Sequence, residues 1–370
     1  MNLMALEAAT AGNAFTELLG GIAPEGTPTW ALWLGAAGAG VGILVAFVSL
    51  VAMFSVWLER KVSAHIQCRY GPMYAGGWHG WAQTLADGVK LLLKEDMIPL
   101  GADKPLFMLA PALVLGAIFG ALVALPLAPG FFFADVNMGL FLILAFSSLT
   151  TIGVVMAGWA SNSKWSLYGA MREAAQVVAY EVPLGVSLFV PLMVAGTFSL
   201  TEASAAQAGW FGMHWFIFQN PFMLPAFIIF FIAALAETKR APFDLPEAES
   251  ELVAGFMTEY SGIRWSFFFM EEYAAMFLMS AVGVVFFFGG YHSPLTALFP
   301  EEATTGLLYQ LVCAGTLIVK SFVGVFVMMW LRWTLPRLRI DQVMSMGYKY
   351  LTPLALVCVL GAAIWETIFA

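Results

Sequence analysis

Hydrophobic and polar positions follow one another in long blocks along the chain. Apolar runs about as long as a membrane-spanning helix, roughly 20 residues, are separated by shorter polar segments. Eight runs qualify as transmembrane helices, at residues 31–58, 105–127, 138–160, 174–195, 215–237, 265–289, 307–331 and 351–369. The fifth is the weakest, because Asn220, Pro221 and Pro225 interrupt its start. The pattern predicts an all-α polytopic membrane protein with eight transmembrane helices.

The polar segment 76–104 contains a shorter periodic pattern. Leu85, Val89 and Leu92 recur at helical spacing, and a tryptophan-rich stretch precedes them. This predicts an amphipathic helix that lies on the bilayer surface. An ordinary amphipathic connector between two spans explains the pattern equally well.

A dense acidic block separates the fifth and sixth runs, with the sequence ETKRAPFDLPEAESELVAGFMTEY. Pro246 suits the first position of a helix, and acidic residues favour the first turn. Apolar residues at 252, 253, 256 and 257 would let such a helix pack on the membrane body. Glu247 and Glu251 are four positions apart and repel each other on one helix face. The block is therefore either a solvated charged face or a set of partly buried carboxylates with coupled titrations.

Composition and charge agree with a membrane protein. The chain is 61% hydrophobic and 11% charged, with a mean hydropathy of +0.84, whereas soluble domains carry about 25% charged residues. Every Lys and Arg except Lys320 falls in the polar segments 59–104, 161–175, 238–272 and 332–350. Because positive residues favour the cytoplasmic side, we expect these four loops inside and residues 1–30 outside, as an N-terminal extension. The chain 1–370 is then a single membrane domain with both termini on the periplasmic side and loop helices on the cytoplasmic face.

The sequence offers no redox cofactor site of its own. Cys68, Cys313 and Cys358 are scattered, without the CxxC pairs typical of zinc and iron–sulfur sites. The four histidines offer no matched pair for a haem, and no glycine-rich phosphate loop indicates nucleotide binding. We expect no metal site, no covalently bound cofactor and no nucleic-acid partner. Redox cofactors would have to come from partner subunits.

Ionisable residues inside the predicted spans are candidates for function, because charges at membrane depth are costly. Lys320 lies in the seventh span, Glu181 in the fourth and Glu271 with Glu272 in the sixth, and Glu237 closes the fifth. One interpretation is a set of buried salt bridges that fix helix positions. The other is a hydrated acidic path for proton transfer, because the acids outnumber the one deep base and unpaired carboxylates must be protonated or reached by water.

Several stretches resemble a known family. They are WLERKVSAHIQCRYGP, LADGVKLLLKED, WASNSKWSLYGAMREAAQVVAYEVPLG, ETKRAPFDLPEAESELVAGFMTEYSG, FFMEEYAAM and LRWTLPRLRIDQVMSMGYKYLTPL. In this order they resemble the H subunit of bacterial NADH–quinone oxidoreductase, the counterpart of mitochondrial NADH dehydrogenase subunit 1 in respiratory complex I. The resemblance covers about residues 55–355 and is most specific over 240–261, while residues 1–50 carry no such signature.

The resemblance implies a fold, an activity and partners. Members of the family cross the bacterial inner membrane with eight spans, anchor the iron–sulfur hydrophilic arm and form much of the quinone chamber. They adjoin an antiporter-like membrane arm, and quinone is a substrate of the whole complex. FMN and the iron–sulfur clusters belong to partner subunits. The expected function is to couple quinone reduction to proton translocation through buried carboxylates.

The resemblance also implies roles for individual residues, none of them covalent catalysis. Around the quinone chamber and its entrance it places Arg60, Gln67, Arg69 and Asp87. The cytoplasmic loop that borders the chamber would contain Arg240, Asp244, Glu247, Glu249 and Glu251. A proton path toward the antiporter-like subunits would contain Glu181, Glu237, Glu259 and Glu272, to which we add Lys320 because of its depth.

Some features depart from the family or leave alternatives open. Met73 and Gly77 stand where the family commonly has Asn and Pro, beside the quinone entrance. Of the doubled pair Glu271–Glu272, the second takes the family position, because it precedes Tyr273. A freestanding ion or proton-coupled transporter fits the composition, although no inverted repeat is visible. The equivalent subunit of a photosynthetic NDH complex or of a membrane-bound hydrogenase also remains open, but the full acidic loop favours a quinone-reducing member.

Overall fold

The computed structural model describes residues 29–131, 133–134, 136–209, 214–247, 249–299 and 306–369. That part of the chain is helical, with loops and one isolated β-bridge between Ala128 and Phe131. The extension predicted at residues 1–30 lies almost entirely outside the described residues. The all-α fold class is confirmed.

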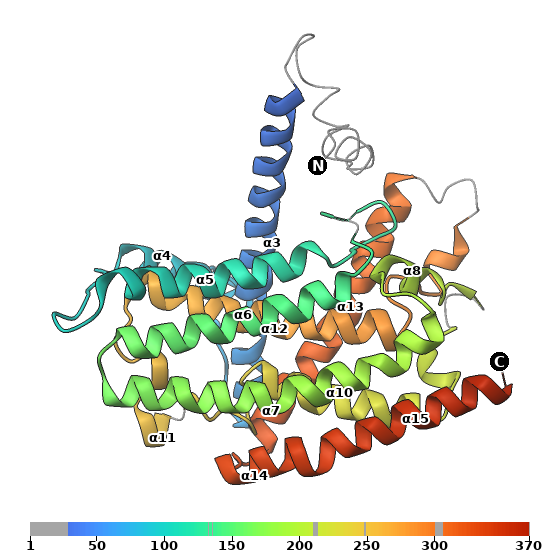
Figure 1. Cartoon of the computed structure of the whole chain (residues 1–370). Helices are drawn as coiled ribbons and strands as arrows, with labels where there is room; N and C mark the ends of the chain where they lie inside the picture. The colour runs from blue at the N-terminus through green and yellow to red at the C-terminus, as the bar shows by residue number, and fades with distance from the viewer. Residues whose placement is uncertain are drawn as a thin grey trace.

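Each of the eight predicted spans is a helix (Figure 1). Within the described residues, seven helices are long and apolar enough to cross a membrane, and the shorter α10 matches the interrupted fifth run. The bounds are α3 Thr29–Ile66, α5 Lys104–Val123, α6 Gly139–Ala160, α7 Lys164–Ala195, α10 Met223–Glu237, α12 Gly262–Phe287, α13 Leu307–Thr334 and α15 Thr352–Phe369. The helix α10 begins late because the Asn220 side chain accepts a hydrogen bond from the Phe222 N–H at 3.0 Å, which holds the chain in a turn.

Shorter elements connect the spans. The α-helices are α4 Gln83–Leu93, α8 Leu200–Ala205, α11 Glu249–Leu252 and α14 Ile340–Ser345. Single 3₁₀ turns are η1 Trp78–Gly80, η2 Phe216–Phe218, η3 Gly255–Met257 and η4 Thr296–Leu298, and a π-helical turn, η6 Met346–Leu351, joins α14 to α15. The helix predicted in 76–104 is thus confirmed as α4. Leu85, Val89 and Leu92 are about half or more exposed, so the apolar face of α4 is open to lipid or to a partner subunit, and its place on the bilayer surface stays a prediction.

The helix α12 lies at the centre of the bundle. It contacts α3, α5, α10 and α13, and every residue from Glu271 to Phe287 is buried. In Figure 1, α5, α6, α7, α10 and α15 run in similar directions across the view, whereas α3 crosses them steeply and extends beyond the body. The carboxylates at the start of the buried part of α12 are therefore enclosed by other helices.

The helix α7 is longer than predicted. It begins at Lys164 and not at 174, so only residues 161–163 link it to α6 as a turn. It continues past Pro183 and Pro191 and ends before Gly196, which takes a left-handed conformation with φ +66°. The added N-terminal turns are amphipathic: Glu173 and Gly169 are buried there.

The amphipathic helix predicted to begin at Pro246 does not form. Instead the loop contains the single turn α11 and the 3₁₀ turn η3. Val253, with φ +68°, and Gly255, with φ +54°, both take left-handed conformations that end any continuous helix. Phe256 is buried as predicted, but Val253 is 61% exposed. Packing of the loop against α7 overrides the local helical pattern.

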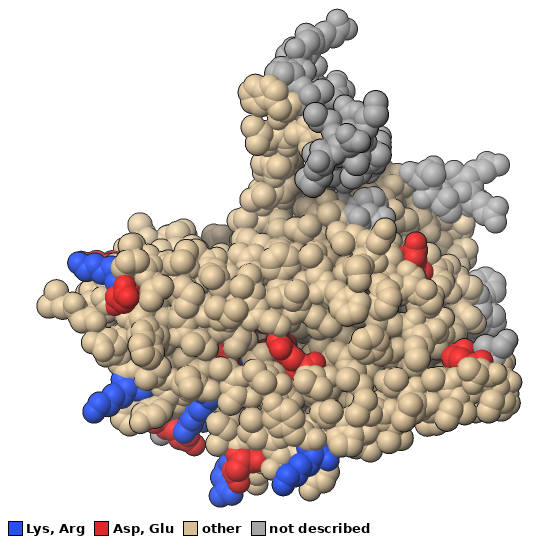
Figure 2. All heavy atoms as spheres, viewed as in Figure 1, with Lys and Arg blue, Asp and Glu red and all other residues tan. Residues whose placement is uncertain are grey.

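Exposed Lys and Arg side chains are concentrated in one part of the face shown in Figure 2. Figure 2 shows Lys and Arg at the left end and the lower margin of the view, while most of this face carries neither sign. Many exposed side chains on the spans are large and apolar, among them Leu34, Ile152, Val319 and Leu360. Such a surface is suited to lipid or to apolar partner subunits and not to water.

Candidate functional site

Arg240 is the centre of a buried cluster of charges. Its Nε lies 2.7 Å from Oε1 of Glu272, and its Nη1 lies 3.2 Å from Oε1 of Glu59. Arg332 also forms an ion pair with Glu59, and the Tyr273 hydroxyl donates a 2.6 Å hydrogen bond to the same carboxylate. Arg240, Glu59 and Glu272 are buried, so each charge requires these partners. The cluster ties α3, α12, α13 and the acidic loop together.

Lys239 forms a second buried cluster. Its Nζ lies 2.8 Å from Oε1 of Glu173 on α7 and 3.4 Å from Oε2 of Glu271 on α12. The ammonium also lies 5.7 Å from the centre of the Phe256 ring. Burial lowers the pKa of Lys239, but the Glu173 and Glu271 carboxylates outweigh burial and raise that pKa above its ordinary value. Lys239 is therefore charged at neutral pH.

The turn that follows α10 positions both Lys239 and Arg240. After Glu237 the chain turns, because Lys239 adopts a left-handed conformation with φ +56°, and the Arg240 N–H donates to the Leu235 carbonyl at 3.4 Å. Left-handed backbone is uncommon for a residue with a side chain. The turn lets two consecutive cations reach two different clusters of carboxylates.

Glu237 and Glu181 differ from Glu272 in their pairing. Glu272 is paired with Arg240, whereas Glu237 Oε2 and Glu181 Oε1 are buried oxygens without a hydrogen-bond partner in the part of the chain that the structure describes. Glu237 is buried at the end of α10, within electrostatic range of Glu181 and of the Lys239 cluster. Buried carboxylate oxygens without partners are costly in an apolar bundle.

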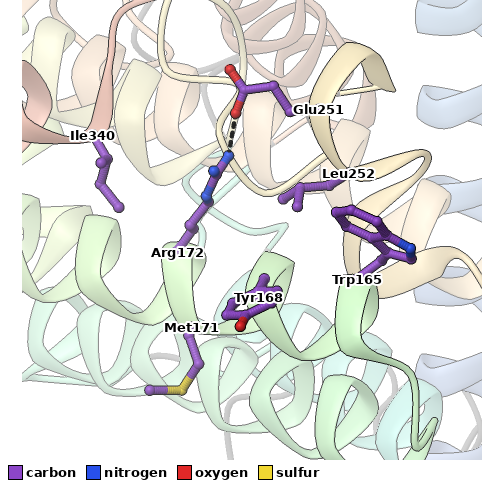
Figure 3. Close-up of a pocket in the computed structure, with 7 residues that line it drawn as sticks. All are labelled: Trp165, Tyr168, Met171, Arg172, Glu251, Leu252 and Ile340. Atoms are coloured by element: carbon purple, nitrogen blue, oxygen red, sulfur yellow. Dashed lines mark hydrogen bonds and ion pairs between the residues drawn. The ribbon is translucent and has the colours of Figure 1, made fainter.

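The acidic loop borders an open pocket of about 410 Å³ (Figure 3). Trp165, Tyr168, Met171 and Arg172 of α7 line it together with Glu251, Leu252 and Ile340. As the dashed line in Figure 3 shows, the Arg172 side chain reaches toward Glu251, and Nη1 lies 2.6 Å from Oε2. The hydrogen bond from Arg172 lowers the pKa of the exposed Glu251 carboxyl below its ordinary value.

The other acids of the loop lie in different environments. Asp244 forms an ion pair with Arg337 at 3.1 Å. Glu247 is half-buried, and burial followed by the nearby Asp244 carboxylate raises its pKa to about 7. The side chain of Glu249 lies outside the described part of the protein. A carboxyl that titrates near neutral pH can bind and release protons under physiological conditions.

The residues expected at the quinone entrance form two pairs, at the end of α3 and directly after it. Arg60 Nη1 lies 2.6 Å from Oδ2 of Asp87 on α4, and the Arg69 Nε donates a 2.6 Å hydrogen bond to Gln67. Gln67 and Arg69 are exposed, and Asp87 is half-buried. Because Glu59 directly precedes Arg60 on α3, the first pair adjoins the buried cluster.

Lys320 is not paired with an acid among the described residues. Its Nζ donates to the carbonyl oxygens of Phe288, Gly290 and His292 at 2.8, 3.1 and 2.5 Å, and it lies 5.3 Å from the centre of the Trp215 ring. These carbonyls follow the C-terminus of α12, where a cation is favoured by the helix dipole. All three ammonium donors are used, which favours a structural role for Lys320 over one in proton transfer.

Glu259 is half-buried between η3 and α12 and forms no ion pair within the described residues. Within those same residues, no three His, Cys, Asp or Glu side chains come together as a metal site.

Sequence reasoning missed part of both clusters. The partners absent from the predicted site are Glu59, Glu173, Lys239 and Arg332, whereas Glu271 is one of the ionisable residues expected inside the sixth span, without an assigned role. Each is an ionisable residue near the end of a span, and Glu59 stands directly before the predicted Arg60. The hydrophobic pattern places Glu173 in a loop, and its depth follows only from the observed start of α7 at Lys164.

Comparison with known proteins identifies the family. The sequence model of the NADH dehydrogenase family matches residues 39–363. A protein of Chlorobium luteolum, named as the H subunit of NADH-quinone oxidoreductase, is 46% identical over 358 residues, which cover 95% of this chain and 94% of the relative. The chain belongs to this H-subunit family. Proteins of the same name are 48% identical in Chlorobaculum parvum, over 87% of this chain and 90% of the relative, and 46% identical in a Geobacillus species, over 92% and 97%.

Membership in the H-subunit family shows the general role of the protein. It is a membrane subunit of a multi-subunit NADH-quinone oxidoreductase. The first alternative drawn from the sequence, a subunit of an electron-transfer complex, is thereby favoured over a freestanding transporter. The seven long apolar helices are consistent with an inner-membrane location.

Proposed function

We propose that this protein forms the quinone-binding chamber and couples quinone reduction to proton translocation through its buried carboxylates. The observation that carries the proposal is the succession of ionisable groups inside an apolar bundle. It leads from the half-buried Glu247, through the Arg240 and Lys239 clusters, to Glu237 and Glu181. Each charge is costly to bury, and ion pairs that fix the helices do not account for Glu237 and Glu181, which each have a buried oxygen without a partner among the described residues.

The balance of charge supports proton exchange. In the buried region, carboxylates outnumber the cations that pair with them. The cations are Lys239, Arg240 and Arg332, and the carboxylates are Glu59, Glu173, Glu237, Glu271 and Glu272. An excess of buried negative charge without partners is strongly unfavourable. Some of these carboxyl groups are therefore protonated, and the site stores protons that a nearby change of charge can move.

Quinone reduction would supply that change. It consumes protons, and the acidic loop with the Arg60–Asp87 and Arg69–Gln67 pairs would border the quinone head-group and its entrance. Partner subunits of the hydrophilic arm would hold FMN and the iron–sulfur clusters, and the buried carboxylates would lead toward the antiporter-like arm. Lys and Arg on alternate loops support both termini on the periplasmic side of a bacterial inner membrane.

Substitution of the loop acids tests the proposal. Glu247→Gln and Glu251→Gln should each lower quinone-linked NADH oxidation while the complex still assembles. The effect should be larger for Glu247→Gln, because it removes a half-buried carboxyl group that titrates near neutral pH, whereas the Glu251–Arg172 pair is exposed. Turnover and assembly are measured in membranes of the same strain.

Glu366→Gln is the matched control, because Glu366 lies near the C-terminus and accepts only a 3.3 Å hydrogen bond from Asn220. It should retain the activity of the unaltered complex. Unchanged turnover in both loop variants would remove the basis of the proposal.

A further inference from the structure

Lys239 is the cation of a cluster that the predicted proton path did not include. It stands between Glu173 at 2.8 Å and Glu271 at 3.4 Å, and all three side chains are at most 5% exposed. The adjacent cluster is balanced by itself, because Arg240 and Arg332 face Glu59 and Glu272. Lys239 alone therefore has to balance two carboxylates, and the group of three carries one net negative charge when all are ionised.

Glu237 lies beside this group on α10, and one of its oxygens is buried without a partner among the described residues. A further negative charge there would face Glu173 and Glu271 in an environment of low dielectric constant, where like charges repel strongly. Lys239 is already occupied by its two partners. Of the three carboxyl groups around Lys239, Glu237 is consequently the one that has no ion pair with that cation and on which we expect the proton.

We propose that Lys239 is a positioning residue whose fixed charge is taken up by its ion pairs with Glu173 and Glu271, so that Glu237 is the carboxyl group that keeps and releases the transferred proton. The inference rests on the proposed function, since it names the group that stores the proton and the cation that selects it. Lys239 acts as a static charge and not as a proton carrier, because two carboxylates hold its ammonium in the charged form.

All the charged groups that face this site enter the argument. They are Glu173 and Glu181 of α7, Glu237 of α10, Glu271 and Glu272 of α12, Glu247 and Arg240 of the acidic loop and, through Arg240, Glu59 of α3 and Arg332 of α13. None of the variants below changes a residue of the Arg240 cluster. A substitution of Lys239 or Glu271 therefore alters only the charge of the Lys239 cluster.

The sign of the shift in pH dependence tests the proposal in the assembled complex. Lys239→Met removes the positive charge, so the carboxyl groups bind protons more tightly and the pH at which proton pumping is half-maximal should rise by about one unit, a tenfold change in proton concentration. Glu271→Gln removes a negative charge and should move the same midpoint to lower pH. The double variant should return near the midpoint of the unaltered complex.

Three further variants complete the experiment. Lys239→Arg keeps a charge that cannot be removed in proteins and should keep the original midpoint. Lys164→Met removes an exposed lysine from the first residue of the same helix that carries Glu173 and should have no effect. Glu237→Gln should abolish proton pumping while NADH oxidation with an artificial electron acceptor continues.

The outcomes separate the two proposals. If Lys239→Met and Glu271→Gln shift the midpoint in the same direction, or leave it in place while Glu237→Gln still stops pumping, the role of Lys239 is overturned and the proposed function survives. If Glu237→Gln pumps normally, the proton path itself is wrong. Where Lys239→Met prevents assembly, Glu271→Gln and Lys239→Arg decide the question, because both nearly keep the size of the original side chain and one keeps the charge.

Discussion

Arg240 and Lys320 show two ways in which single residues hold a charge inside an apolar bundle. Arg240 uses the planar guanidinium to contact Glu272 and Glu59 from two sides. Lys320 instead donates to three backbone carbonyls beyond the end of α12. The first arrangement couples four segments through charges, whereas the second fixes one helix end. The two cations therefore differ in the nature of their partners, and not in depth alone.

The raised pKa of Glu247 gives a prediction at the same scale. The folded protein holds this proton up to about pH 7, whereas an ordinary carboxyl group loses it near 4.5. Between these values the unfolded chain binds fewer protons than the folded one, so the group lowers the stability of the fold as pH rises. Glu247→Gln removes this penalty, and its melting temperature relative to the unaltered complex should rise across that window and then stay constant. Thermal unfolding of the purified complex at a series of pH values measures this difference in melting temperature. A difference that is the same at every pH would contradict the raised pKa assigned to Glu247.

At the scale of elements, α7 and the acidic loop are joined by a close backbone contact. A Cβ on Gly169 would lie 2.8 Å from the Gly255 Cα and 2.9 Å from the Pro246 carbonyl oxygen. Only glycine fits at both positions, because Gly255 also has positive φ. This contact explains why the loop forms turns and not the helix that its pattern favours. The same contact fixes how α7 lies along the loop, and so the position at which Glu173 meets Lys239.

Gly169→Ala should therefore destabilise the protein, by about 1–3 kcal/mol for a side chain forced into packed backbone. Gly185→Ala is a matched control on the same helix, because a Cβ there meets nothing within 4 Å. That substitution should be neutral or stabilise the helix by up to about 1 kcal/mol. The amount of assembled complex that survives heating distinguishes them. Equal behaviour of the two variants would mean that the backbone contact does not constrain the loop.

At the scale of the whole molecule, the distribution of Lys and Arg indicates how the protein is oriented across the membrane. Every basic residue except Lys320 lies on or beside four alternate connections, and the Lys and Arg side chains seen in Figure 2 gather toward one end and one margin. The buried clusters lie toward the same end, since Lys239 and Arg240 directly follow α10 and Glu59 lies near the end of α3. A quinone chamber bounded by these groups would therefore lie at the cytoplasmic side.

This orientation makes a topological prediction. Alkaline phosphatase fused after Ala370 should be active, because the C-terminus would be periplasmic, and green fluorescent protein fused there should not fluoresce. A fusion truncated in the turn at residues 161–163 should show the opposite result. Fluorescence from the C-terminal fusion would reverse the assigned orientation.

The sequence by itself determined the membrane class, the number of spans and the family. Long apolar runs, charge bias and ordered motifs are local properties, and they need no knowledge of which helices touch. The tertiary structure alone decided which carboxylates are paired. Glu173, Lys239 and Glu271 are far apart along the chain, and they meet only because α7 and α12 pack around the end of α10. The energy of a buried charge depends on the few groups within several ångströms of it, and that neighbourhood exists only in the folded bundle.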